Sequence, residues 1–441
     1  MLKILLFFVM SAMMITANDG GKIFPYKYEN YLLDNGLKAI LIPMKGSGII
    51  AYYSVVRTGS RDEWEPGKSG FAHFFEHMMF RGTEKFPADM YDSIVTSIGA
   101  DANAYTSSDL TVYHMKFASD DLETVISIES DRFQFLRYTL EQFQTEAGAV
   151  YGEYRKNRTN PWSVVFEEMA DLAYDKHTYK HTTMGFERDI KDMPNQYEYS
   201  LSFYNRYYRP SNVVLVLAGD FETDKAKALI TKYYGNWKPG YVAPQIETEP
   251  EQKAFRKKEV QYEGKSLPLI LLSYKSDAFS AKNKNLLSTI YFAELAFGST
   301  SDLYKKLVLN EQKVQFIGAS PAENRDPGMF DIYSMIKDEK DVDYVLAEIE
   351  KTIQQFKDQP VDETRLNNLK KRNKYSFIMG LDNPNSVASA LPQLITVTGG
   401  IEVIDEMYSE LEKLTPADIQ NAVKHYFTKE RSNLIILKGS K

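Results

Sequence analysis

A stretch rich in proline and acidic residues divides the chain near its middle. Residues 237–253 hold three prolines and several acids, a composition that does not build a regular helix or strand. Each flanking half contains strand-rich runs followed by helical ones, and each closes on a continuous apolar run typical of a buried strand, Val213–Gly219 and Ser432–Gly439. The sequence therefore predicts two domains, 22–236 and 254–441, joined by a linker at 237–253.

The run Ser69–Phe80 places three chemically distinctive side chains on one predicted helix. Residues three or four apart share a helical face, so His73 and His77 can reach one metal ion while Glu76 lies beside its open coordination position. The pattern H-x-x-E-H is the inverted form of a zinc peptidase motif. Its neighbours are almost all apolar, and polar groups embedded among them need partners that a metal would provide. The motif predicts a zinc site.

A catalytic zinc site usually has three protein ligands, so the two histidines leave one ligand to be found. The helical run Glu141–Arg158 offers two carboxylates, Glu146 and Glu153, which lie two turns apart on one face. One of the two can bind the metal while the other supports the site from behind. The residues alone do not decide which.

The second half echoes the first without its metal-binding residues. When Phe80–Thr83 is aligned with Phe297–Thr300, the three polar positions of the motif fall on Ile290, Ala293 and Glu294. This alignment predicts an internal repeat in which only the first half binds metal.

A second histidine pair is a weaker candidate. His177 and His181 are also four residues apart, but no glutamate stands between them and loop-forming residues surround them. The pattern favours a surface connection over a metal pair.

The spacing of Glu146 and Glu153 after the motif resembles that of the pitrilysin, or M16, zinc peptidases, which include insulysin and the mitochondrial processing peptidase. The resemblance implies that His73, His77 and Glu153 bind Zn²⁺. It further implies that Glu76 is the general base and that Glu146 orients a ligand histidine.

Other segments fit the same family, including Leu33–Lys38, Gly59–Glu63 and Gly99–Thr106. In relatives, the segment that matches Asn103 and Ala104 belongs to an edge strand that pairs with the extended substrate backbone. The resemblance implies that these two residues bind the peptide substrate.

The likeness extends from about Tyr26 to the C-terminus and implies an α+β fold. The expected architecture is two homologous α/β sandwich domains, each a mostly antiparallel sheet packed with helices, related as a pseudo-repeat. The family further implies a clamshell-type assembly with a single active site.

One departure from the family concerns the second half. In many relatives a short helix there, or in a partner subunit, carries an Arg and, seven residues later, a Tyr that hold the substrate and the transition-state oxygen. Val308 and Gln315 occupy those places here, and neither can do that work. The resemblance therefore implies a heterodimer whose M16-fold partner supplies Arg and Tyr. If the alignment slips, the nearest substitutes are Tyr304, Lys305 and Lys306.

These observations predict a zinc metalloendopeptidase that cleaves unfolded peptides or oligopeptides. A processing peptidase with one dedicated substrate is an alternative, since strand pairing reads backbone rather than sequence. A non-catalytic peptide-binding or structural subunit is another. The net charge of −7, with no basic stripe, argues against nucleic acid as a partner.

The first seventeen residues resemble a secretory signal peptide, with a basic start and an apolar run from Ile4 to Ile15. The run is shorter than the roughly 20 residues that span a bilayer, so cleavage near Ala17 is expected rather than a stable membrane anchor. Export, most simply to a periplasm, follows from this. The chain has no cysteine, which excludes disulfides and thiolate zinc ligands.

Overall fold

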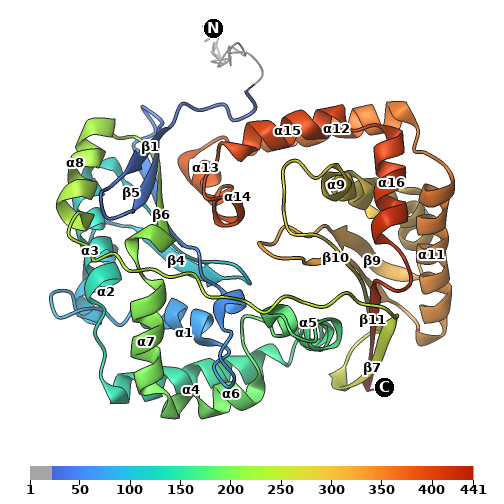
Figure 1. The fold of residues 1–441 in the computed structure, drawn as a ribbon, viewed down its shortest axis with the longest axis horizontal. Helices are drawn as coiled ribbons and strands as arrows, with labels where there is room; N and C mark the ends of the chain where they lie inside the picture. The colour runs from blue at the N-terminus through green and yellow to red at the C-terminus, as the bar shows by residue number, and fades with distance from the viewer. Residues whose placement is uncertain (1–21, 441) are drawn as a thin grey trace, which may run out of the picture.

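Two β-sheets, each packed with helices, form two lobes joined into one elongated body (Figure 1). The computed structural model describes residues 22–440, and the expected signal peptide at 1–17 lies outside this range. The α+β class predicted from the family resemblance is confirmed.

The first sheet has six strands in the order β1-β2-β6-β3-β5-β4. Neighbouring strands are antiparallel except β2 and β6, which are parallel. The strands are β1 Glu29–Leu32, β2 Lys38–Pro43, β3 Ile49–Val56, β4 Asp101–Thr106, β5 Thr111–Ala118 and β6 Val213–Gly219.

The second sheet repeats this arrangement without a counterpart of β1. Its order is β7-β11-β8-β10-β9, and β7 and β11 form its parallel pair. Each apolar run predicted to close a half lies between a parallel and an antiparallel neighbour: β6 between β2 and β3, and β11 between β7 and β8. The strands are β7 Arg256–Lys265, β8 Leu269–Lys275, β9 Val314–Ser320, β10 Met329–Ile336 and β11 Ser432–Ser440. The sheets are therefore two copies of one mostly antiparallel design.

Helices cover the sheets and connect their strands (Figure 1). Those of the first half are α1 Phe71–Met78, α2 Ala88–Ser97, α3 Leu122–Phe135, α4 Leu140–Asn157, α5 Pro161–Ala173, α6 Glu187–Asp192, α7 Tyr197–Tyr207 and α8 Thr223–Tyr234. Those of the second half are α9 Lys284–Phe297, α10 Asp302–Tyr304, α11 Val342–Asp358, α12 Glu363–Met379, α13 Pro384–Ser389, α14 Pro392–Thr398, α15 Val403–Lys413 and α16 Pro416–Tyr426.

The continuous apolar runs are explained by burial on both faces of the sheets. Successive side chains of a strand point to opposite faces. In β6, Leu215 and Leu217 pack with helices of their own half, whereas Val214 and Val216 point into a second core. Every residue of β6 is buried. An alternating pattern would have left one face in water, so the run matches the structure.

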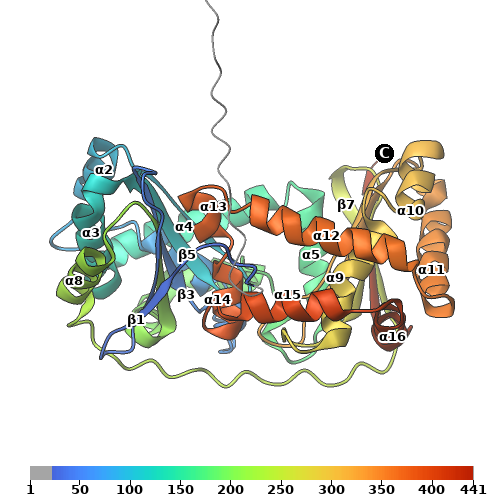
Figure 2. The same ribbon diagram turned by 90° about the horizontal axis from the view of Figure 1, so that it is seen from above.

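Each sheet is covered on one face by helices of the other half. Helices α13 and α14 of the second half lie against β3, and α13 also lies against β6 of the first sheet (Figure 2). Reciprocally, α5 of the first half packs Val165 and Met169 against Leu271 and Ile435 of the second sheet. Neither sheet is thus fully covered by its own half.

The segment predicted as a linker forms no helix or strand between the end of α8 and the start of β7. Figure 2 shows it running along the outside of both lobes. Because helices cross between the halves, the domain limits 22–236 and 254–441 stay a prediction. Within residues 22–440, no single helix is long and apolar enough to cross a membrane; one bent pair, Pro384–Thr398 with Val403–Lys413, meets that test by length and composition alone.

A partly buried ionic contact joins the two halves. The carboxylate of Asp326, in the second half, accepts a hydrogen bond from Nε of Arg61 at 2.5 Å and lies 2.9 Å from Nε2 of His177. His177 and His181 are both buried. The interpretation of this pair as a surface connection is therefore wrong. Sequence spacing could not indicate that a loop of the other half contacts His177.

We predict that Asp326→Asn lowers the free energy of unfolding at pH 7 by about 2 kcal/mol, because Arg61 and His177 lose a charged acceptor. Burial acts to raise the pKa of Asp326, but the hydrogen bonds from His177 and Arg61 outweigh it and hold that pKa below its usual value. A lowered pKa contributes stability above the unfolded value of about 3.9, and that stability is lost as pH falls.

Urea denaturation of the wild type and the variant at several pH values measures this effect. The difference between them should be full at pH 7 and should shrink below about pH 4. Glu123→Gln, which removes an exposed pair with Lys232, is the control and should leave stability close to that of the wild type. A difference that does not depend on pH would rule out the ionised carboxylate as its source.

Candidate metal centre

Helix α1 carries both histidines of the motif and is anchored by its apolar residues. Phe71, Phe74, Phe75 and Met78 are buried in the core of the first half. The helix begins after Gly70, whose φ of 94° lies in the left-handed region that favours glycine. With eight residues, α1 is too short to be stable alone, so its position depends on packing.

Helix α4 brings the second set of polar residues against α1. It begins with a capping box in which Thr139 accepts a hydrogen bond from the backbone of Gln142. Phe143 of α4 packs edge-to-face on Phe74 of α1, with ring centroids 5.1 Å apart. This contact places the two helices so that their polar residues meet.

His73, His77 and Glu153 converge on one point. Each can offer one ligand atom, and these atoms all lie within 4.8 Å of one another. Oε2 of Glu153 lies 3.3 Å from Nε2 of His77 and 3.7 Å from Nε2 of His73. Two imidazole nitrogens and one carboxylate oxygen are a donor set that suits zinc and leaves a position open. The group is thus able to hold a metal ion.

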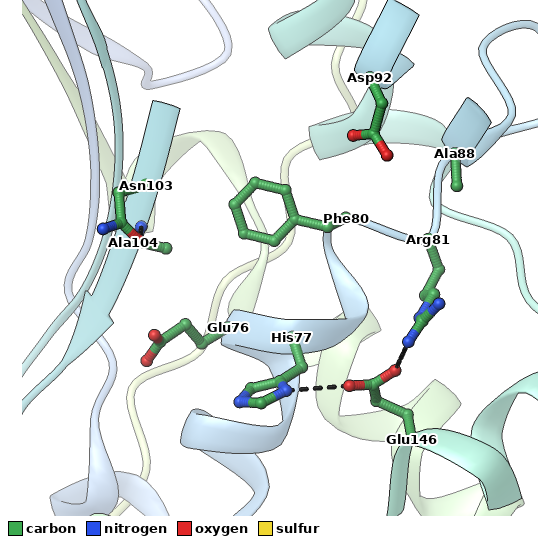
Figure 3. A pocket seen from close by; sticks show the side chains of 9 residues that line it. All are labelled: Glu76, His77, Phe80, Arg81, Ala88, Asp92, Asn103, Ala104 and Glu146. Atoms are coloured by element: carbon green, nitrogen blue, oxygen red, sulfur yellow. Dashed lines mark hydrogen bonds and ion pairs between the residues drawn. The ribbon is translucent and has the colours of Figure 1, made fainter. Parts of the chain in front are cut away.

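Glu146 does not reach this point but supports it from behind. Its Oε1 lies 2.9 Å from Nδ1 of His77, and its Oε2 accepts a hydrogen bond from Nε of Arg81 at 2.7 Å (Figure 3). Burial acts to raise the pKa of Glu146, but hydrogen bonds from His77 and Arg81 outweigh it and lower that pKa. Arg81 was not predicted from the sequence; its place four residues after His77 was the available signal.

Glu76 lies beside the metal group, on the same helix. Its Oε2 accepts a hydrogen bond, at 2.6 Å, from Oγ1 of Thr106, the last residue of β4. Burial raises the pKa of Glu76, and the Thr106 hydroxyl opposes that rise. Thr106 falls within the family-like segment Gly99–Thr106, but its contact with Glu76 could not be read from the sequence.

The two histidines differ in their electrostatic environment. Burial and the neighbouring His77 lower the pKa of His73 to about 4, so its imidazole is neutral at pH 7. The hydrogen bond to Glu146 raises the pKa of His77. A neutral imidazole is the form that binds metal. His73 is therefore already in the metal-binding form near pH 7.

Strand β4 forms one wall beside the metal group. It is an edge strand, hydrogen-bonded to β5 alone. Asn103 and Ala104 of this strand line a cavity of about 370 Å³ together with Glu76 and His77 (Figure 3). A second cavity of about 390 Å³ opens on the other side of Glu76 and is lined by Glu153, Tyr105 and Phe166 among others. The site therefore has room on both sides of Glu76.

The second half has no counterpart of this group among the described residues. In α9, Glu294 forms an ion pair with Arg372 at 2.8 Å, and Ala293 is buried. Val308 packs against the core, while Gln315 is exposed on the edge strand β9.

The residues considered as substitutes for the missing Arg and Tyr have other contacts. Nζ of Lys306 lies 2.7 Å from Glu348, and Lys305 pairs loosely with Asp302. Tyr304 packs against the core of the second half.

Comparison with known families identifies two matching profiles. One, described as insulinase (peptidase family M16), matches residues 51–187, and the other, described as the peptidase M16 inactive domain, matches residues 196–373. Zinc protease PqqE of Helicobacter pylori is 26% identical over 418 residues, which cover 93% of each chain. Mitochondrial-processing peptidase subunit beta of Bos taurus is 31% identical over 206 residues, 46% of this chain and 41% of that one.

The fold agrees with a solved structure over nearly its whole length. The crystal structure of a protease from Helicobacter pylori matches with a TM-score of 0.88 at 26% identity, covering 94% of this chain and 99% of that one.

We predict that Glu153→Gln, which removes a ligand, weakens zinc affinity by more than about 100-fold. That is more than the loss of a supporting residue costs. Glu146→Gln should weaken affinity about 10- to 100-fold, since His77 loses its acceptor. Competition with a chromophoric chelator measures both. Glu167→Gln, which lines the second cavity but lies outside the metal group, is the matched control and should bind zinc like the wild type. Equal affinity in all three variants would exclude this group as the site.

Proposed function

The chain belongs to the M16 peptidase family, and we propose that it is a zinc-dependent endopeptidase that cleaves unfolded peptides as the zinc-bearing subunit of a heterodimer. The observation that carries this proposal is the convergence of His73, His77 and Glu153 with Glu76 at their side. A fold kept only for binding would not need that set of donors. This weighs against the alternative of a non-catalytic subunit.

The roles of the residues follow from their positions. His73, His77 and Glu153 would hold the ion, and Glu146 would orient His77 through Nδ1. Zinc in such a site lowers the pKa of water and polarises a peptide carbonyl. Glu76 is the proposed general base, which takes a proton from the attacking water and passes it to the leaving amine.

An extended peptide is the substrate that β4 suits best. The free edge of a sheet offers unpaired backbone N–H and C=O groups to another strand. Asn103 and Ala104 lie on this edge beside Glu76, so a peptide paired there would pass the general base. Pairing through backbone groups selects an unfolded chain with little demand on its sequence. Because backbone pairing does not tell one substrate from another, a processing peptidase with one dedicated substrate stays as the second candidate.

The heterodimer is proposed from what Val308 and Gln315 cannot provide. Val308 has no hydrogen-bond donor, and the amide of Gln315 is neutral where the family has Arg and Tyr. A lost oxyanion donor costs a factor of about a hundred or more in rate. One relative is by name a subunit, the mitochondrial-processing peptidase beta chain, which supports this part of the proposal. Export to a periplasm is proposed from the first seventeen residues alone.

Hydrolysis of a quenched, unstructured peptide tests the function. We predict that Glu76→Gln lowers kcat by about 10²- to 10⁴-fold, since it removes the general base. Bound zinc, quantified in the same samples, should be unchanged because Glu76 is not in the ligand set.

The outcome for the wild type alone decides the role of a partner. Zinc without turnover supports the heterodimer, whereas turnover by the isolated chain would contradict the need for a partner and leave the peptidase assignment intact. Absence of zinc from both proteins would overturn the proposal as a whole.

Strand pairing makes a second prediction. N-methylation of a substrate amide that faces β4 should lower kcat/KM by about tenfold, because it removes one backbone hydrogen bond and adds bulk at the pairing edge. Amides along a strand point alternately to either side, so methylation of the adjacent amide is the matched control and should have little effect. Equal losses at both amides would argue against binding as an added strand.

A further inference from the structure

The two proposed ligand histidines are not supported in the same way. His77 has the usual partner behind it, since its Nδ1 meets Glu146. His73 is buried, and within residues 22–440 its Nδ1 has no hydrogen-bond partner. Ligand histidines are normally oriented through the nitrogen that does not bind the metal. The orientation of His73 therefore depends on its packing, including the edge-to-face contact with His77, and on the backbone that carries it.

That backbone is the first turn of α1. Helix α1 starts at Phe71, so His73 is its third residue, whereas His77 lies one turn further on. The first turn of any helix has N–H groups without partners inside the helix. Gly70, at the start of α1, has no side chain to cap them. An outside acceptor is needed to keep this turn formed.

Glu63 supplies that acceptor. One oxygen of its carboxylate accepts from the backbone N–H of Gly70 at 2.7 Å, and the other accepts from that of Ala72 at 2.6 Å. Glu63 is 3% exposed, so water does not compete for these bonds. Burial raises the pKa of Glu63 well above its usual value, and the two accepted N–H bonds oppose that rise by favouring the ionised carboxylate. A negative charge is also favoured at a helix N-terminus.

The position of Glu63 is itself fixed from the other half of the chain. Glu63 directly follows the turn Ser60–Asp62, in which Arg61 is bonded to Asp326 of the second half. The backbone oxygen of Asp62 accepts from the hydroxyl of Tyr207 at 2.8 Å. The turn that precedes Glu63 is therefore fixed by two contacts, one with Asp326 and one with Tyr207.

We propose that Glu63 is a positioning residue that fixes His73 for metal binding by capping the first turn of α1, as Glu146 fixes His77. The proposal rests on the proposed function, because it takes His73 as a zinc ligand. Glu63 touches neither metal nor substrate and acts through the backbone at Gly70 and Ala72. Two separate carboxylates thus orient the two histidines of one motif.

Zinc affinity of Glu63→Gln tests this directly. A glutamine amide can accept from one N–H group but would present its own NH₂ to the other, so the first turn should loosen around His73. We expect zinc affinity to fall about tenfold, the lower end of what loss of a supporting residue costs. Chelator competition should be run well below the unfolding temperature of the variant.

The visible spectrum of the Co²⁺-substituted protein adds a second readout. Its bands should shift in Glu63→Gln because the geometry at His73 changes. A residue that only stabilises the fold would leave both the spectrum and the affinity of the folded protein unmoved.

Glu249→Gln is the matched control. Glu249 also accepts backbone N–H bonds, but from Asp175, Lys176 and His177 rather than from α1. This variant should lose stability and keep its zinc affinity and its Co²⁺ spectrum. If Glu63→Gln fails to fold, Glu63→Asp, which keeps the carboxylate on a shorter side chain, should show the same loss to a smaller extent.

Failure of this inference is distinguishable from failure of the proposed function. A folded Glu63 variant that binds zinc as tightly as the wild type overturns the role of Glu63 alone. A wild type that binds no zinc overturns the metal site, and the inference with it.

Discussion

The packing of α1 against α4 is the contact on which the candidate metal centre depends. The histidines and Glu153 are far apart in the sequence, and no local element could bring them together. The edge-to-face contact of Phe74 with Phe143 sets the separation of the two helices. Glu146 lies in the buried stripe of α4, between Phe143 and Val150. Burial of that stripe therefore fixes both the carboxylate that meets His77 and, two turns on, the carboxylate of Glu153.

Sequence reasoning succeeded where the information was local. The helical spacing of His73 and His77, and the two-turn spacing of Glu146 and Glu153, follow from 3.6 residues per turn and need no tertiary knowledge. The choice between the two glutamates as ligand came from the family resemblance, and the geometry agrees with it. The apolar runs that became β6 and β11 were also local signals, because burial on both faces leaves no polar alternation.

Sequence reasoning failed where the partner of a residue lies far along the chain. A periodic pattern tells which face of a helix is buried but not what covers it, so the packing of α5 and α13 on the sheet of the other half was not predicted. The same limit hid the burial of His177 by the loop that carries Asp326. Glu63 belongs to the family-like segment Gly59–Glu63, but its role as a cap was not predicted, since an acceptor eight residues before the start of α1 leaves no recognisable spacing.

The region around Val308 and Gln315 has an irregular backbone. Residues Lys305–Asn310 form a π-helical turn, and Gln312 has a positive φ of 53°. Such irregular backbone is often found at functional sites. Within this turn Val308 has no hydrogen-bond donor and packs against the core of the second half, and Lys306 is paired with Glu348. The turn offers neither Arg nor Tyr, and the supply of both by a partner of the same fold stays a proposal.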